Sequence, residues 1–93
     1  MRRIRWTQLA ICDLTGICDY LESHESPAFA ARVAQAVHSA AYSLARFPKK
    51  GRPGREPGTR ELVIQKHPHV IVYEERGNSV EVLRVVHTSQ QWP

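Results

Sequence analysis

Two side chains near the ends of predicted strands have the chemistry to act on a phosphate group. Arg60 opens one apolar run and His87 closes another. A rigid sheet would hold each side chain beside a loop, where an arginine can bind a phosphate ester and a histidine can protonate it. A structural role is the alternative, and the pattern alone favours it. Arg60 would then pair with a carboxylate such as Glu61 or Glu81, and His87 would cap a strand edge.

The positive charge of the chain is concentrated in one short segment. The whole chain carries a net charge of +4, whereas residues 46–60 hold six basic residues against Glu56, a net charge of +5. The segment 47–58 is also rich in proline and glycine, which predicts an exposed loop without regular structure. Such a loop would attract an anionic partner and add affinity without defining the fold. The alternative is a solvated connector. The basic residues of segment 47–58 are Lys49, Lys50, Arg52 and Arg55.

Motifs for cofactors and metal ions are missing from the sequence. It has no glycine-rich nucleotide loop, serine nucleophile elbow, His-x-x-x-His pair or EF-hand. His67 and His69 flank Pro68 in a predicted turn, but no carboxylate or cysteine stands at metal-ligand spacing beside them. Cys12 and Cys18 lack the partners of a zinc site or a disulfide framework and are expected to be reduced. We therefore expect no cofactor and no bound metal.

Two amphipathic helices are predicted in the first half of the chain. Thr7 suits a helix N-cap, and apolar residues recur at spacings of three and four over residues 8–23. Ser26 and Pro27 begin a second helix over residues 27–46, which is rich in alanine. Alanine lets helices approach closely, so the two should pack as an antiparallel hairpin.

One short strand precedes these helices and three strands follow them. The strand signals lie at residues 3–6, 60–65, 70–74 and 80–86. Strict alternation in the last run places one set of side chains on a single face, namely Val80, Val82, Arg84 and Val86. The order β-α-α-β-β-β predicts an α+β fold, in which the helical hairpin packs on an antiparallel sheet.

The size of the chain fits a single domain over residues 1–93. With 93 residues, such a domain buries only about two thirds of its unfolded surface, so a binding partner can add much stability. No apolar run approaches the ~18 residues of a membrane-spanning helix, and residues 1–6 lack the apolar stretch of a signal peptide. We therefore expect a cytoplasmic protein without membrane contact.

Three late stretches of the chain resemble the RelE/ParE toxin superfamily. They are residues 58–64 (GTRELVI), 70–73 (VIVY) and 80–93 (VEVLRVVHTSQQWP). Trp6 before a helix and a helical pattern that includes Asp13 and Tyr20 extend the similarity over nearly the whole chain. The resemblance implies a toxin of a type II toxin–antitoxin module with a β-α-α-β-β-β fold. It also implies a hetero-oligomer with a small antitoxin, which we expect to be acidic.

The superfamily contains ribosome-dependent messenger-RNA endonucleases, such as RelE. These enzymes commonly place an arginine on the second late strand, where this chain has Val70. They also use an arginine just after the last strand and a tyrosine near the end, where this chain has Ser89 and only Trp92. These departures count against RNA cleavage. If the chain is a nuclease acting on ribosome-bound messenger RNA, the resemblance implies that its catalytic residues are Arg60, Arg84 and His87.

The superfamily also contains inhibitors of DNA gyrase, such as ParE, which need no catalytic chemistry of their own. The ending Leu-Arg-Val-Val-His is a feature of such members, so the sequence favours a ParE-like toxin. It would poison gyrase, arrest growth and serve plasmid stabilisation. The residues predicted to bind the target are Lys49, Lys50, Arg52, Arg55, Arg60 and Trp92. A third hypothesis is a degenerate toxin that only binds an antitoxin.

Overall fold

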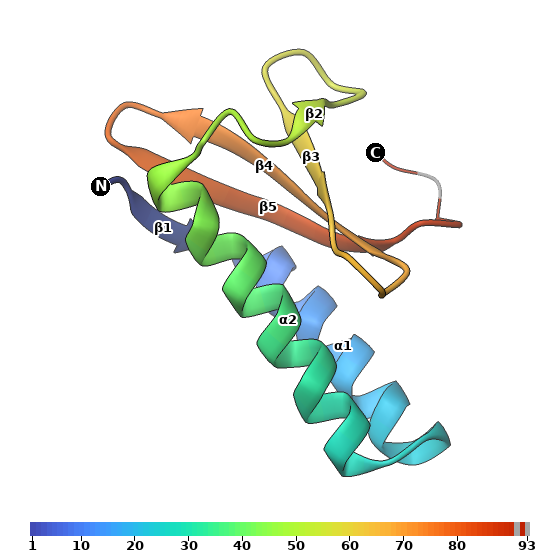
Figure 1. Cartoon of the computed structure of the whole chain (residues 1–93). Coiled ribbons are helices and arrows are strands. Elements are labelled where there is room, and N and C mark those ends of the chain that lie inside the picture. The colour runs from blue at the N-terminus through green and yellow to red at the C-terminus, as the bar shows by residue number, and fades with distance from the viewer. Residues whose placement is uncertain (91, 93) are drawn as a thin grey trace.

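The computed structural model describes residues 1–90 and 92 of the chain. Within these residues the chain forms two helices and five strands, which confirms the predicted α+β class. The two helices lie side by side on one face of the sheet, and their far ends project past it (Figure 1). No helix formed by the described residues has the length and apolar character needed to cross a membrane. The elements are β1 (Arg3–Trp6), α1 (Gln8–His24), α2 (Pro27–Arg46), β2 (Arg52–Pro53), β3 (Arg60–Val63), β4 (His69–Arg76) and β5 (Ser79–His87).

Both helices begin where their capping residues predict. The Thr7 hydroxyl accepts a hydrogen bond from the backbone N–H of Ala10, and the Ser26 hydroxyl accepts one from Phe29, each at 3.0 Å. Each bond satisfies a backbone donor that the first helical turn leaves free. The helices pack against the sheet through small and branched side chains that are fully or nearly buried, which are Ala10, Val33, Val37, Ala41 and Leu44.

The sheet is mixed, so the prediction of an antiparallel sheet is wrong for one strand pair. The strand order is β1-β5-β4-β3-β2, and β1 runs parallel to β5. All other neighbouring strands are antiparallel. Antiparallel neighbours can be joined by a short turn, whereas β1 and β5 are separated by most of the chain, and no turn constrains their relative direction.

A β-bulge in β5 overturns the strict alternation predicted for this strand. Tyr73 pairs with Val82 and Val72 pairs with Arg84, so Leu83 is the extra residue. Before the bulge, Val80 and Val82 share one face, as predicted, and this face covers the helices, which alternation alone did not decide. After it, Val85 joins the core beneath the helices, and Val86 turns to the opposite face of the sheet. The prediction from strict alternation placed Val85 and Val86 on the wrong faces, because a bulge shifts the side-chain register by one residue.

The basic segment 47–58 is partly regular structure, so its prediction as an irregular loop is wrong. Arg52 and Pro53 form β2, which pairs with Glu61 and Arg60 of β3. Gly51 is buried and has no room for a side chain, since a Cβ there would lie 2.8 Å from the Tyr73 ring and 2.9 Å from the Glu61 carbonyl oxygen. The segment therefore packs on the sheet at a fixed place.

Candidate functional site

A buried glutamate on β3 gathers three side chains on the face of the sheet opposite the helices. Glu61 pairs with Val72 across β3 and β4, and Val72 belongs to a small apolar cluster on this face. The Glu61 residue is 5% exposed. One of its oxygens, Oε1, accepts hydrogen bonds from Nε and Nη2 of Arg52 at 3.3 and 3.1 Å.

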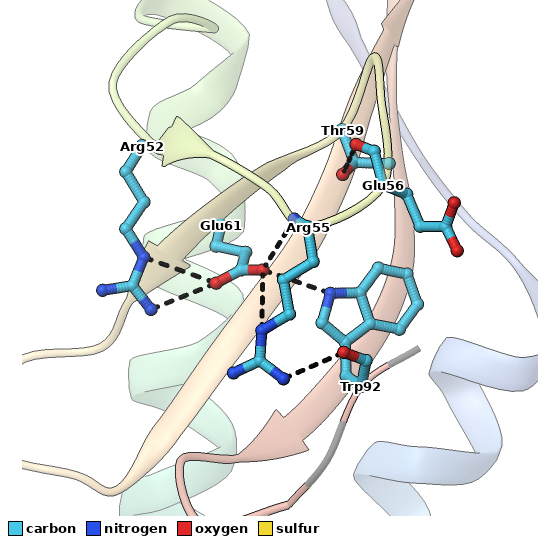
Figure 2. Close-up of polar contacts among 6 residues, drawn as sticks. All are labelled: Arg52, Arg55, Glu56, Thr59, Glu61 and Trp92. Atoms are coloured by element: carbon cyan, nitrogen blue, oxygen red, sulfur yellow. Dashed lines mark hydrogen bonds and ion pairs between the residues drawn. The ribbon is translucent and has the colours of Figure 1, made fainter.

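The second carboxylate oxygen binds Arg55 and Trp92 (Figure 2). Oε2 accepts from the backbone N–H of Arg55 at 3.3 Å and from the indole Nε1 of Trp92 at 3.1 Å, and Arg55 Nε lies 3.9 Å away. Nη1 of Arg55 also donates to the backbone carbonyl of Trp92 at 2.9 Å. The chain end is thereby tied to the basic segment. We call Glu61, Arg52, Arg55 and Trp92 the Glu61 cluster.

The charge of Glu61 is stabilised by the groups that surround it. Burial raises the pKa of Glu61, but hydrogen bonds from Arg52, the Arg55 backbone and Trp92 outweigh burial and lower the pKa overall. The carboxylate is therefore ionised at neutral pH and holds the two guanidinium groups in place.

The shape of the Glu61 cluster suits binding better than catalysis. The side chains of Arg52 and Arg55 are 58% and 52% exposed, so the guanidinium groups remain accessible to a partner. The hollow beside them has a volume of about 40 Å³. Pockets that enclose a small-molecule ligand usually have about 300–1,000 Å³. The cluster can present fixed positive charge to an anionic surface, but it cannot enclose a small substrate.

The structure brings together only some of the residues predicted to bind a target. Arg52, Arg55 and Trp92 meet at Glu61, as described above. Lys49 lies elsewhere, where its Nζ pairs with Glu75 at 2.9 Å. Lys50 Nζ donates to Ser43 Oγ on α2 at 3.3 Å. The six predicted residues therefore do not form one continuous set of contacts.

Arg60 supports the basic segment from the other face of β3. It pairs with Tyr73, whose side chain belongs to the core beneath the helices. Nη1 of Arg60 donates to the carbonyl of Gly51 at 2.8 Å and to that of Lys49 at 3.4 Å. The Tyr73 hydroxyl donates to the Pro48 carbonyl at 2.7 Å and accepts from the Gly51 N–H. The carboxylate pairing expected for Arg60 is wrong, since backbone carbonyls take its place.

Arg84 and His87, named with Arg60 for a nuclease, have separate partners. Nε and Nη2 of Arg84 donate to the two carboxylate oxygens of Asp13 on α1, at 2.7 and 3.1 Å. This bond raises the pKa of Arg84. The same carboxylate accepts from the backbone N–H of Val85 at 3.0 Å, on the stretch of β5 that extends past β1. His87 is exposed, and its Nδ1 accepts from the Ser89 N–H at 3.1 Å.

A cleft of about 430 Å³ separates the helical hairpin from the end of the sheet, and His69 and His87 line it. Their rings lie edge to face with centroids 5.6 Å apart. Burial lowers the pKa of His69, and electrostatic repulsion from the His87 and His67 side chains adds to the effect. No group of three or more His, Cys, Asp or Glu side chains that could hold a metal ion occurs within residues 1–90 and 92.

The sequence analysis missed two carboxylates as organising groups. Glu61 was considered only as a partner of Arg60, and Asp13 only as part of a family pattern. A signal for Glu61 does exist in the sequence. Glu61 is the single acidic residue of the β-rich run 60–65, and it closely follows Arg52 and Arg55 in a segment whose prolines and glycines allow a turn. For Asp13 the sequence offers no such signal, since its partner Arg84 lies 71 residues away.

Fold and site together define a small α+β domain of the RelE/ParE type, with an exposed pair of arginines held by a buried glutamate. Comparison with known proteins identifies the family. A family model described as "ParE toxin of type II toxin-antitoxin system, parDE" matches residues 4–92. The chain therefore belongs to the ParE toxin family, whose ParDE modules imply an antitoxin partner.

Two relatives are toxins by name, and one of them carries the name RelE. The protein Y4kP of Sinorhizobium fredii (strain NBRC 101917 / NGR234) is 45% identical over 92 residues, which cover 99% of this chain and 94% of that protein. Toxin RelE2 of Caulobacter vibrioides is 38% identical over 90 residues, which cover 97% of this chain and 99% of that protein. A solved structure titled "Chromosomal ParDE TA system from P. aeruginosa" superposes with a TM-score of 0.85 at 26% identity, covering 94% of this chain and 96% of that chain.

Proposed function

We propose that this chain acts in the cytoplasm as a growth-arresting toxin that poisons DNA gyrase, and that an acidic antitoxin neutralises it. One observation carries the choice of gyrase over RNA cleavage. Arg84, a cation named for catalysis, is held by both oxygens of Asp13. A nuclease needs cations aimed at the negative charge that develops on the phosphoryl oxygens. The Arg84 side chain is only 22% exposed, and a guanidinium group held by both oxygens of a carboxylate is poorly placed for that role.

Two further observations support a mechanism without catalysis. The position where RelE-type nucleases carry an arginine is Val70, which is 5% exposed and packs against Val72 and Val86. Arg60 donates its hydrogen bonds to the backbone carbonyls of Lys49 and Gly51 in the basic segment. A toxin that holds gyrase on cleaved DNA needs a binding surface rather than an acid and a base.

The Glu61 cluster is the part of this chain that we assign to target binding. Its arginines are pre-oriented by a buried carboxylate, so little side-chain entropy is lost when a partner binds them. Trp92 adds a large aromatic surface next to Arg55. Arginine and tryptophan are the residue types that most often dominate protein interfaces energetically.

Regulated expression in bacteria tests the function. We expect growth arrest with induction of the SOS response and chromosomal DNA breaks, and relief of the arrest when an acidic reading frame adjacent to the gene is co-expressed. Arg55→Ser should weaken the arrest at matched levels of folded protein. Arg76→Ser is the matched control, because Arg76 is an exposed arginine whose partner is the nearby Glu74.

Other results would assign a different function. Rapid loss of translation with cuts in ribosome-bound messenger RNA would identify a RelE-like endonuclease. No arrest by the folded protein, together with co-purification of the antitoxin, would identify a degenerate toxin that only binds its antitoxin.

A further inference from the structure

A shallow groove lies at the C-terminal end of α2, separate from the Glu61 cluster. Its volume is about 690 Å³, and it is lined by Arg2, Phe47, Pro48, Lys49 and Lys50. Phe47 follows the last residue of α2 and is 58% exposed, so its ring offers apolar surface to a partner.

The backbone of this groove is fixed before any partner binds. The Pro48 carbonyl accepts from the buried Tyr73 hydroxyl at 2.7 Å, and the Lys49 carbonyl accepts from Arg60. The backbone N–H of Phe47 donates to Ser43 and closes the last turn of the helix. A preformed groove avoids the entropy cost of ordering a loop on binding.

Positive charge surrounds the exposed phenylalanine. Three cations line the groove, and the acid that approaches them is Glu75, at 2.9 Å from Lys49 Nζ and 3.5 Å from Arg2 Nε. One carboxylate cannot neutralise three cations. The contact recorded for Lys50 Nζ within the described residues is the neutral hydroxyl of Ser43. The rim therefore keeps an excess of positive charge around an apolar floor.

We propose that this groove binds an acidic segment of a partner protein, whose apolar side chain packs on Phe47 and Pro48. The carboxylates of that segment would approach Lys49 and Lys50 at the rim. An apolar centre within a charged rim is the usual arrangement of a protein interface. A single-stranded nucleic acid fits less well, since such sites stack successive bases on several aromatic side chains and Phe47 is the only aromatic residue lining this groove within residues 1–90 and 92.

The groove is independent of the surface assigned to the toxin's target. Arg60, which holds the Lys49 carbonyl, and Glu61, which holds Arg52, are neighbours on β3 and therefore point to opposite faces of the sheet. The two surfaces can bind different partners at once, and either assignment can fail without the other.

Fluorescence anisotropy with a synthetic probe tests the groove. The probe is a short fluorescein-labelled peptide of glutamates with a central pair of leucines, and one matched peptide replaces Glu by Gln while another replaces Leu by Ser. We expect the wild-type protein to bind the first peptide more tightly than either matched peptide. Binding should weaken with added salt, because the rim charges are exposed. Shifts of the backbone amide NMR signals should map to Phe47, Lys49 and Lys50.

Matched variants locate the binding site. Phe47→Ser should lower the affinity about tenfold, the loss expected for one packed apolar side chain. Tyr42→Ser should leave the affinity unchanged, since Tyr42 is an exposed aromatic residue of the same helix that does not line the groove. Lys50→Ser should lower both the affinity and its salt dependence. Lys66→Asn should change neither, because Lys66 is an exposed lysine that does not line the groove.

Three results would overturn the proposal. The first is equal binding by wild type and Phe47→Ser when both have the same melting temperature. The second is tighter binding of oligodeoxythymidine than of the acidic peptide at residues 47–50. The third is a dimer in sedimentation that Phe47→Ser dissociates, which would make a second copy of the chain the occupant.

Discussion

Replacing Glu61 by glutamine removes the charge that holds the Glu61 cluster while keeping the side chain's shape. Glutamine would turn an acceptor oxygen into an N–H donor that faces Arg52, Arg55 or Trp92, all of which are donors themselves. At least one of the hydrogen bonds at 3.1–3.3 Å would be lost, and the remaining bonds would no longer be charge-assisted.

The magnitude follows from the exposure of each partner. A hydrogen bond to a charged group contributes about 1.5–3 kcal/mol. The side chains of Arg52 and Arg55 are more than half exposed and their charges are screened by solvent. We therefore assign their contacts with Glu61 only the ~0–1 kcal/mol that surface ion pairs contribute to stability. The bonds from the Trp92 indole and the Arg55 backbone to a nearly buried oxygen keep more of their value. We expect a loss of about 2 kcal/mol in the free energy of unfolding.

Thermal and urea unfolding followed by circular dichroism measures this loss. In a domain of this size, each 1 kcal/mol lowers the melting temperature by about 4–8 °C, so Glu61→Gln should melt about 8–16 °C lower. Glu74→Gln is the control, because its partner Arg76 is exposed and only two residues away, and it should change stability by less than about 0.5 kcal/mol. Equal stability of Glu61→Gln, Glu74→Gln and wild type would refute the view that Glu61 organises this face.

Three further predictions concern single side chains. Since burial lowers the pKa of His69 below the ordinary value of about 6.5, the unfolded chain binds more protons, and stability should fall as the pH drops below about 6.5. When urea unfolding is measured between pH 7 and pH 5, the stability of His69→Gln should fall less steeply with decreasing pH than that of the wild type. Tyr73→Phe leaves two buried backbone groups without the hydroxyl that bonds them and should cost about 1–3 kcal/mol in urea unfolding, with a near-neutral result contradicting the anchoring role. His87→Ala should still arrest growth at matched folded levels, whereas loss of an essential proton donor would reduce the rate about 100-fold or more.

The helices were predictable because their signals are local. Thr7 and Ser26 cap the turn that follows them, and proline at position 27 is compatible with a first helical position. The predicted helices 8–23 and 27–46 end within one residue of those observed. Nothing distant in the chain is needed for either boundary.

Features that depend on distant residues were not predictable. Leu83 becomes a bulge only because β4 and β5 pair in a particular register. The short strand β2 forms despite Pro53 and Gly54 because Glu61 and Tyr73 hold the segment on both sides. The composition of the segment indicates many residues that break regular structure. It carries no information on the tertiary contacts that order the segment.

The site was predictable in residue type but not in arrangement. Arginines in a basic segment indicated an anion-binding surface, and Arg52 and Arg55 do lie together with exposed side chains beside Glu61. The counter-charge that orients them was missed, since a buried carboxylate on a strand is recognised only when its partners are placed around it. For the same reason Arg60 was expected at a target and is found bonded to backbone carbonyls.

The most direct test of the account is a DNA cleavage assay with purified components. The folded protein is incubated with bacterial DNA gyrase, supercoiled plasmid and ATP, and the complexes are denatured with detergent and digested with protease before electrophoresis. We predict linear DNA that increases with the amount of toxin and that disappears when gyrase is left out. Absence of linear DNA, while the same preparation cuts messenger RNA on ribosomes and His87→Ala does not, would contradict the account.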